Sequence, residues 1–130
     1  MKKLLSVITI ATFVLTLFST SVFSVFAETS TLKNIKYTIH DDEVSIYDLQ
    51  LVYGDVVIPA KIEGCPVTSI SFEACSENNS ITSIVIPEGV KSIAASAFEN
   101  CKKLSKITLP DSLESIGYAA FDGTAYCKKT

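Results

Sequence analysis

The 130-residue sequence has no arginine, no tryptophan and a single histidine, His40. Its 14 acidic side chains outnumber its 11 lysines. A protein that binds nucleic acid needs a basic surface to displace the counterions of the phosphate backbone, and this chain lacks one. We therefore expect no nucleic-acid partner, and anionic lipid is disfavoured for the same reason.

The sequence also lacks the motifs of catalytic and metal sites. His40 lies beside Asp41 and Asp42, but no Gly-x-Ser-x-Gly elbow supplies a nucleophile for a catalytic triad. The run from Asp41 to Glu43 falls short of the six or more oxygens of a calcium loop. No Cys-x-x-Cys pair or cysteine–histidine cluster indicates zinc. We expect a non-enzymatic protein without catalytic residues, metal or cofactor.

Residues 1–27 have the layout of a secretory signal peptide. A basic start is followed by an apolar run over 4–18, and Val25-Phe26-Ala27 offers a cleavage site after Ala27. The alternative is a membrane anchor, since 4–27 is long enough to span a bilayer. Cleavage would leave 103 residues, enough for one domain without membrane contact, with 9 lysines against 14 acids and a net charge of −5.

Residues 81–127 repeat themselves with a step of 23 residues. The matched segments are 81–87 with 104–110, 90–93 with 113–116, and 97–98 with 120–121. A period in the twenties, with apolar residues in fixed columns, is typical of a solenoid. One such unit cannot bury its own apolar face, so the units must stack.

An earlier coil begins with Val56-Val57-Ile58-Pro59 and carries an insertion at 61–66, whose glycine and proline indicate a turn. Each coil is expected to have two short strands, the first ended by a proline, and a short helical turn such as 94–100. The predicted coils are 55–80, 81–103 and 104–126, with a short tail up to residue 130.

Residues 28–54 are predicted to form a lead-in and an N-terminal cap. Alternating β-forming residues lie on both sides of the polar turn 40–43, which indicates a β-hairpin. A hairpin in this position would cover the open end of the first coil, as solenoids require for solubility.

Strand periodicity separates the inward from the outward columns, because successive side chains of a strand point to opposite faces. The side chains expected in the core, with the two phenylalanines as plugs, are Ile84, Ile86, Phe98, Ile107, Leu109 and Phe121. The outward columns would form one small face that carries any contact with a partner: Asp55, Val57, Ser83, Val85, Lys106 and Thr108.

Residues 81–104 fill every column of the pattern I-x-x-I-x-I-P-x-x-V-x-x-I-x-x-x-A-F-x-x-C-x-x-L. In this the sequence resembles the BspA-type leucine-rich repeat family. The resemblance implies a β-rich solenoid of the leucine-rich-repeat type, and a secreted or cell-surface protein. The partner that it implies is a host or neighbouring-cell surface protein or glycan, bound in adhesion. The chain departs from the family in having few repeats.

Ser69, Ser92 and Ser115 occupy one column in the three predicted coils. They could present a row of hydroxyls to a ligand, or form hydrogen bonds at the bend of each coil. The second interpretation is favoured because serine competes well for local backbone partners.

The four cysteines, Cys65, Cys75, Cys101 and Cys127, leave two alternatives. An even number in a secreted chain indicates two disulfides. Cys101, however, stands where the family places a buried cysteine, which behaves as a small hydrophobic residue. The sequence leaves the paired and free states open.

Two functions fit these observations. The first is a module that binds a protein or glycan through the outward face. The second is a structural remnant, or a terminal fragment of a larger surface array, with no ligand of its own. Residues 127–130 stop where another coil would begin, which favours the second interpretation.

Overall fold

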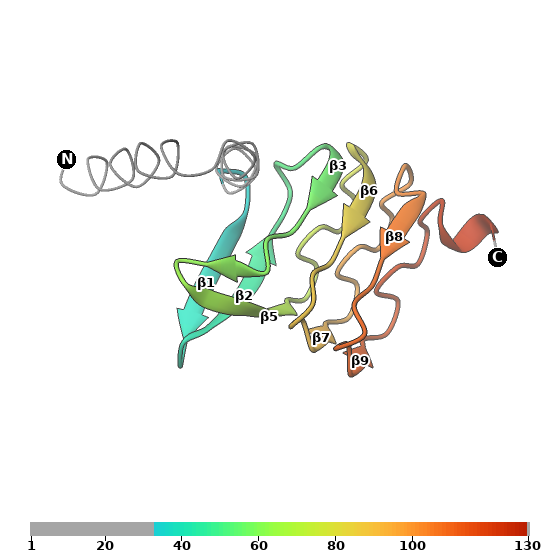
Figure 1. The fold of residues 1–130 in the computed structure, drawn as a ribbon. Helices are drawn as coiled ribbons and strands as arrows, with labels where there is room; N and C mark the ends of the chain where they lie inside the picture. The colour runs from blue at the N-terminus through green and yellow to red at the C-terminus, as the bar shows by residue number, and fades with distance from the viewer. Residues whose placement is uncertain (1–32, 130) are drawn as a thin grey trace, which may run out of the picture.

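The computed structural model describes residues 33–129, so the signal-peptide assignment for residues 1–27 lies outside them. The described chain consists of short strands and one 3-10 helix (Figure 1). The strands are β1 Lys36–His40, β2 Glu43–Asp48, β3 Gly54–Val57, β4 Lys61–Ile62, β5 Cys65–Ile70, β6 Ile81–Val85, β7 Ser92–Ile93, β8 Lys106–Thr108 and β9 Ser115–Ile116, and the helix is η1 Cys127–Lys129. No helix in this part of the chain is long and apolar enough to cross a membrane.

Two sheets run along a stack of three coils (Figure 1). Each coil contributes one strand to each sheet: β3 and β5, then β6 and β7, then β8 and β9. The smaller sheet has the order β3-β6-β8, and the larger sheet has the order β1-β2-β5-β7-β9, with β4 paired to β5. Strands of successive coils pair in parallel. The predicted solenoid of about three stacked coils is confirmed.

The β1–β2 hairpin precedes the first coil. The strands pair antiparallel from Lys36 to Asp48, and His40 faces Glu43. Asp41 and Asp42 form the turn with φ of 50° and 60°, the left-handed conformation that suits a two-residue hairpin turn. β2 then pairs in parallel with β5. The hairpin therefore adds two strands to the larger sheet, while the smaller sheet ends at β3, and this end of the stack is stepped.

The predicted helical turn over 94–100 is instead a series of tight turns. The amides of Ser96, Phe98 and Asn100 donate to carbonyls of the next coil, at 3.0, 2.7 and 2.7 Å. An amide that bonds to the neighbouring coil is not available to the carbonyl four residues earlier, so an α-helix cannot form here. The stack fits closely at this corner, because a side chain at Gly117 would collide with the backbone at Ala95.

The core lies between the two sheets and is best formed in the middle coil. Ile84, Ile86 and Phe98 are buried there. Phe98 stacks on Phe121 of the third coil, with ring centroids 5.4 Å apart and an interplanar angle of 8°.

The third coil is less covered than the sequence predicts. Ile107 and Phe121 are half-buried, and Leu109, expected in the core, is 40% exposed. Ile107 lies on β8 and Leu109 directly follows it, and β8 is the last strand of the smaller sheet in the described part of the chain. The inward side chains of this coil are covered by the middle coil on one side, and residues 33–129 hold no fourth strand for this sheet on the other.

Candidate binding face

The six residues predicted to form an outward face lie on three adjacent strands. Parallel pairing places Asp55, Ser83 and Lys106 in one row across β3, β6 and β8. It places Val57, Val85 and Thr108 in a second row, two residues further along the same strands. We refer to these six residues as the binding face.

Alternation along the strands turns this face outward. In β3, Val56 is buried while Val57 is 60% exposed. In β6, Ile84 is fully buried between the half-buried Ser83 and Val85. Neighbouring coils are about 4.8 Å apart. The central side chain is the hydroxyl of Ser83 in the first row and the apolar Val85 in the second.

Asp55 is held in its charged state at one end of the face. Its Oδ1 accepts hydrogen bonds from Ser83 Oγ at 2.5 Å and from Thr82 Oγ1 at 3.1 Å. These bonds, the one from Ser83 first, lower the pKa of the Asp55 carboxyl, and the positive charge of Lys106 acts in the same direction. The face thus carries a fixed negative charge on β3 and a positive charge on β8.

The first serine of the predicted column, Ser69, is hydrogen-bonded to the hairpin. Ser69, Ser92 and Ser115 lie in register across β5, β7 and β9. Ser69 Oγ donates to Ser45 Oγ of β2 at 2.9 Å, and Ser45 Oγ lies 3.0 Å from Ser71 Oγ. The hydrogen-bonding interpretation therefore applies to Ser69, which links the hairpin to the first coil.

The buried cysteines act as part of the core. Cys75 and Cys101 are fully buried free thiols, and Cys101 Sγ donates to Cys75 O at 2.9 Å. The hydrogen bond with Cys101 and burial raise the pKa of the Cys75 thiol. Cys65 is a half-buried free thiol. Cys127 Sγ lies near the carbonyl of Phe121, at 3.2 Å.

His40 and its acidic neighbours lie exposed at the turn of the β1–β2 hairpin. His40 Nδ1 lies 2.8 Å from Asp41 Oδ2, and both side chains are 88% exposed. Across residues 33–129 no group of three or more histidine, cysteine or acidic side chains is placed to hold a metal ion.

An open polar hollow was not predicted. It has a volume of about 320 Å³ and is lined by Glu77, Asn79, Asn100 and Lys102. Glu77 and Asn100 are 23 residues apart, as are Asn79 and Lys102. The sequence did contain a signal for this hollow. Residues one repeat step apart lie in neighbouring coils, so the step alone predicts that these four polar side chains share one corner of the first two coils.

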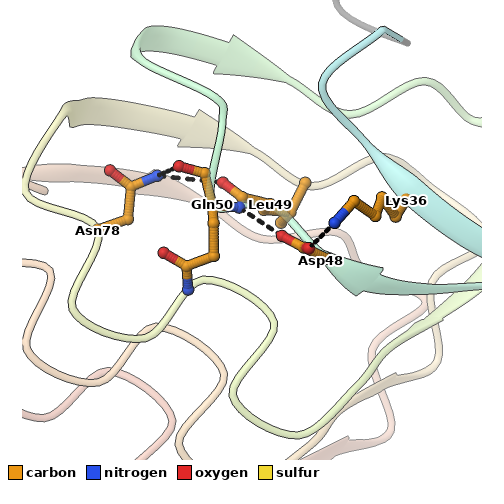
Figure 2. A network of polar contacts seen from close by, with 5 residues as sticks. All are labelled: Lys36, Asp48, Leu49, Gln50 and Asn78. Carbon is orange, nitrogen blue, oxygen red and sulfur yellow. Dashed lines mark hydrogen bonds and ion pairs between the residues drawn. The ribbon is translucent and has the colours of Figure 1, made fainter.

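Sequence reasoning also missed the role of Asn78, one of two buried polar residues in the described part of the chain. Its Nδ2 donates to the carbonyls of Leu49 and Val52, both at 3.0 Å, and approaches that of Gln50 at 3.4 Å. Figure 2 shows Asn78 reaching across to this segment. Asp48 anchors the same segment by accepting from Gln50 N at 2.8 Å and pairing with Lys36 Nζ at 2.6 Å (Figure 2).

Comparison with known proteins agrees with this architecture. Residues 68–130 match the family model described as BspA type Leucine rich repeat region (6 copies). A search of curated proteins found no match.

Two solved structures are similar to this chain. The T. pallidum Leucine Rich Repeat protein TpLRR is 32% identical, with a TM-score of 0.66 over 70% of this chain and 44% of its own. A leucine-rich repeat protein from Bacteroides ovatus is 29% identical, with a TM-score of 0.58 over 70% of this chain and 32% of its own. The chain therefore spans less than half the length of either structure. The predicted leucine-rich-repeat solenoid is confirmed, and residues 68–130 are similar to the BspA-type leucine-rich repeat family.

Proposed function

We propose that this protein is an exported, non-catalytic module that contacts a surface protein or a glycan through the binding face. One observation carries the proposal: six side chains from three coils are held in two registered rows on the outward side of β3, β6 and β8. Side chains that point outward are not needed to form the core, and the coil stack fixes their spacing.

The composition of the face supports contact with a partner. Val57 and Val85 are neighbours in one row, and Val57 is 60% exposed. Outward-facing valines on adjacent strands, here one exposed and one half-buried, promote aggregation unless something covers them. Asp55 and Lys106, at opposite ends of the other row, would fix the orientation of a partner more than its affinity.

The face is too small for tight binding by a single copy. Specific interfaces bury about 800 Å² on each partner, and three short strands offer less. Binding should therefore be weak unless several faces act together, in which case effective concentration raises the overall affinity.

A second candidate is a structural segment of a larger repeat array without its own ligand. It is favoured by the lengths of the similar structures, of which this chain covers 44% and 32%. In that case the face would be one part of a longer surface.

Changing Val57 and Val85 to lysine should weaken binding to the partner by on the order of tenfold or more, because two charges would replace the apolar centre of the interface. Binding would be measured on arrays of matrix proteins and glycans. The two changes leave the bonds of Ser83 and Thr82 to Asp55 in place.

The matched control is Thr38→Lys with His40→Lys, which adds two lysines to exposed positions of β1. If a ligand is found and a folded Val57→Lys/Val85→Lys protein still binds it like the control, the binding face is wrongly assigned. If no ligand binds the unchanged protein, the structural role is favoured.

A further inference from the structure

The polar hollow at the corner of the first two coils has described chain on both sides of it. We use this name for the hollow of about 320 Å³ that is lined by Glu77, Asn79, Asn100 and Lys102. On one side, the first coil is bonded to the preceding segment, since Gln50 Nε2 donates to Ser76 O at 2.9 Å. On the other side, Asn100 N donates to Asp122 O of the third coil at 2.7 Å. Neighbouring layers of the stack therefore shape the hollow.

Hydrogen bonds fix the backbone around the hollow. Asn79 Nδ2 donates to Glu77 O at 3.0 Å, and Asn79 Oδ1 accepts from Lys102 N at 3.0 Å. Glu77 N donates to Glu99 O of the middle coil at 2.7 Å. The Asn79 side chain therefore ties the backbone of Glu77 to that of Lys102. Because this backbone is already ordered, a ligand would lose less free energy to ordering it.

The other three lining side chains are available to a ligand. Within residues 33–129, no hydrogen bond or ion pair uses the side chain of Glu77, Asn100 or Lys102. Room for the Asn100 amide comes from Gly123, 23 residues later, because a Cβ there would lie 2.4 Å from Asn100 Oδ1. The hollow therefore presents a carboxylate, an ammonium group and an amide that the described chain does not pair.

This set of groups suits a neutral ligand that carries several hydroxyls. A hydroxyl both donates and accepts, so it can donate to the Glu77 carboxylate, accept from Lys102 Nζ, or do either with the Asn100 amide. An anion such as phosphate would be attracted by Lys102 but repelled by Glu77. A divalent cation would meet one carboxylate beside an ammonium group, which falls short of the six or so oxygen ligands that calcium or magnesium takes.

An exposed tyrosine beside the hollow favours a sugar over a peptide. Gly54 N donates to Ser80 O at 2.9 Å, which places Tyr53 beside Ser80, the residue that follows Asn79. Tyr53 is 74% exposed. The face of a tyrosine ring is an apolar surface, and the C–H face of a sugar ring can pack against it. A peptide would instead need pockets for its side chains, whereas the four side chains that line this hollow are polar.

We propose that the polar hollow binds a short saccharide, with Glu77, Asn100 and Lys102 bonding to ring hydroxyls and Tyr53 packing against the apolar face of a neighbouring sugar unit. Its volume of about 320 Å³ is at the lower end of the range for ligand pockets, about 300–1,000 Å³. Because the hollow is open, we expect a dissociation constant on the order of 1 mM for a disaccharide.

The hollow is a different site from the binding face. Its four residues precede β6 and β8, whereas the binding face lies on the outward side of these strands and of β3. The inference therefore does not rest on the proposed function. The Val57→Lys/Val85→Lys protein should still bind a disaccharide in the hollow, so failure of one site can be told from failure of the other.

The test follows the amide signals of the purified, nitrogen-15-labelled protein by NMR while one probe at a time is added. The probes are lactose, maltose, cellobiose and N,N′-diacetylchitobiose, with tetra-alanine and inorganic phosphate as a peptide and an anion. At concentrations up to on the order of 50 mM, well above the expected dissociation constant, at least one disaccharide should cause saturable shifts at Asn79, Asn100 and Lys102. Tetra-alanine and phosphate should not.

Glu77→Gly separates binding from stability. Glu77 has a φ of 62°, a conformation that suits glycine, and Gly123 holds the same column of the third coil with a φ of 70°. The change should therefore keep the melting temperature but weaken disaccharide binding by on the order of tenfold, because a charged acceptor is lost. The matched control is Glu73→Gly, the same change at an exposed residue with a φ of 52° on the corner that follows β5. It should leave binding unchanged.

A second pair of variants tests the tyrosine. Tyr53→Ala should weaken disaccharide binding by roughly several-fold, whereas Tyr118→Ala, which removes an 89% exposed ring on the corner that follows β9, should not. The proposal is overturned if no disaccharide causes saturable shifts at the hollow, or if tetra-alanine or phosphate binds there instead. It is also overturned if Glu77→Gly and Glu73→Gly bind the disaccharide equally well.

Discussion

Replacing Phe98 with alanine is expected to unfold most of the protein at ordinary temperature. Phe98 is fully buried in the middle coil and stacks on Phe121. Removal of a buried phenylalanine side chain costs about 3–5 kcal/mol, through lost burial and the cavity that remains. A single domain is typically stable by about 5–15 kcal/mol. Thermal and denaturant melts followed by circular dichroism would measure the loss.

Two further phenylalanine-to-alanine variants test whether the loss of stability depends on how deeply the side chain is buried in the stack. Phe121→Ala should cost less, because Phe121 is half-buried and packs against one neighbouring coil. Phe72→Ala should change the free energy of unfolding little, since Phe72 is 60% exposed. A melting temperature for Phe98→Ala within a few degrees of the parent would contradict a core built by stacked coils.

Replacing Asn78 with alanine should lower the free energy of unfolding by about 2–4 kcal/mol, because a buried polar group that loses its partner costs about 1–3 kcal/mol. Asn78 Nδ2 serves the carbonyls of Leu49 and Val52, and alanine cannot replace either bond. Its Oδ1 also accepts from Ser80 N at 2.8 Å. Denaturant titration would give the free energy.

The appropriate control is Asn79→Ala, the exposed neighbour of Asn78. It should cost less than Asn78→Ala, because the bond that its Nδ2 donates to Glu77 O is exposed to water. Asn78→Asp tests the donor itself, since it keeps an acceptor for Ser80 N but turns a carboxylate toward two carbonyl oxygens. If Asn78→Asp were as stable as the parent, the bonds to the segment at 49–52 would not hold the first coil.

The repeat allowed the inward and outward side chains of each coil to be predicted, because burial follows the periodicity of the strands. Ile84 and Ile86 lie inside and Val57 outside for the reason given by strand alternation alone. The hairpin was predictable from its polar turn. Leu109 shows the limit: it has the same column as the buried Ile86, but burial also requires a covering coil, which the column does not encode.

Contacts between coils were the part that the sequence did not reveal. The sequence of residues 94–100 predicts a helical turn. The hydrogen bonds that their amides donate to the next coil select tight turns instead. Asn78 departs from the column in which Cys101 stands, and its three carbonyl partners come from a segment before the first coil. Such pairings depend on how coils stack, not on local composition.

The ladder of amides between coils also bears on the order in which the protein opens. In the isolated chain, the middle coil bonds to a coil on each side, through Cys75 N to Ala97 O and Phe98 N to Ala120 O, both at 2.7 Å. The third coil is bonded on one side among the described residues. Unfolding in such a linear stack proceeds from its least supported unit. Deuterium should therefore enter first at Gly117, at Ala120 and at Phe98, whose amide bonds to Ala120 O of the third coil, and later at Cys75, whose acceptor Ala97 O lies in the middle coil. Exchange times would thus record the order in which the coils open.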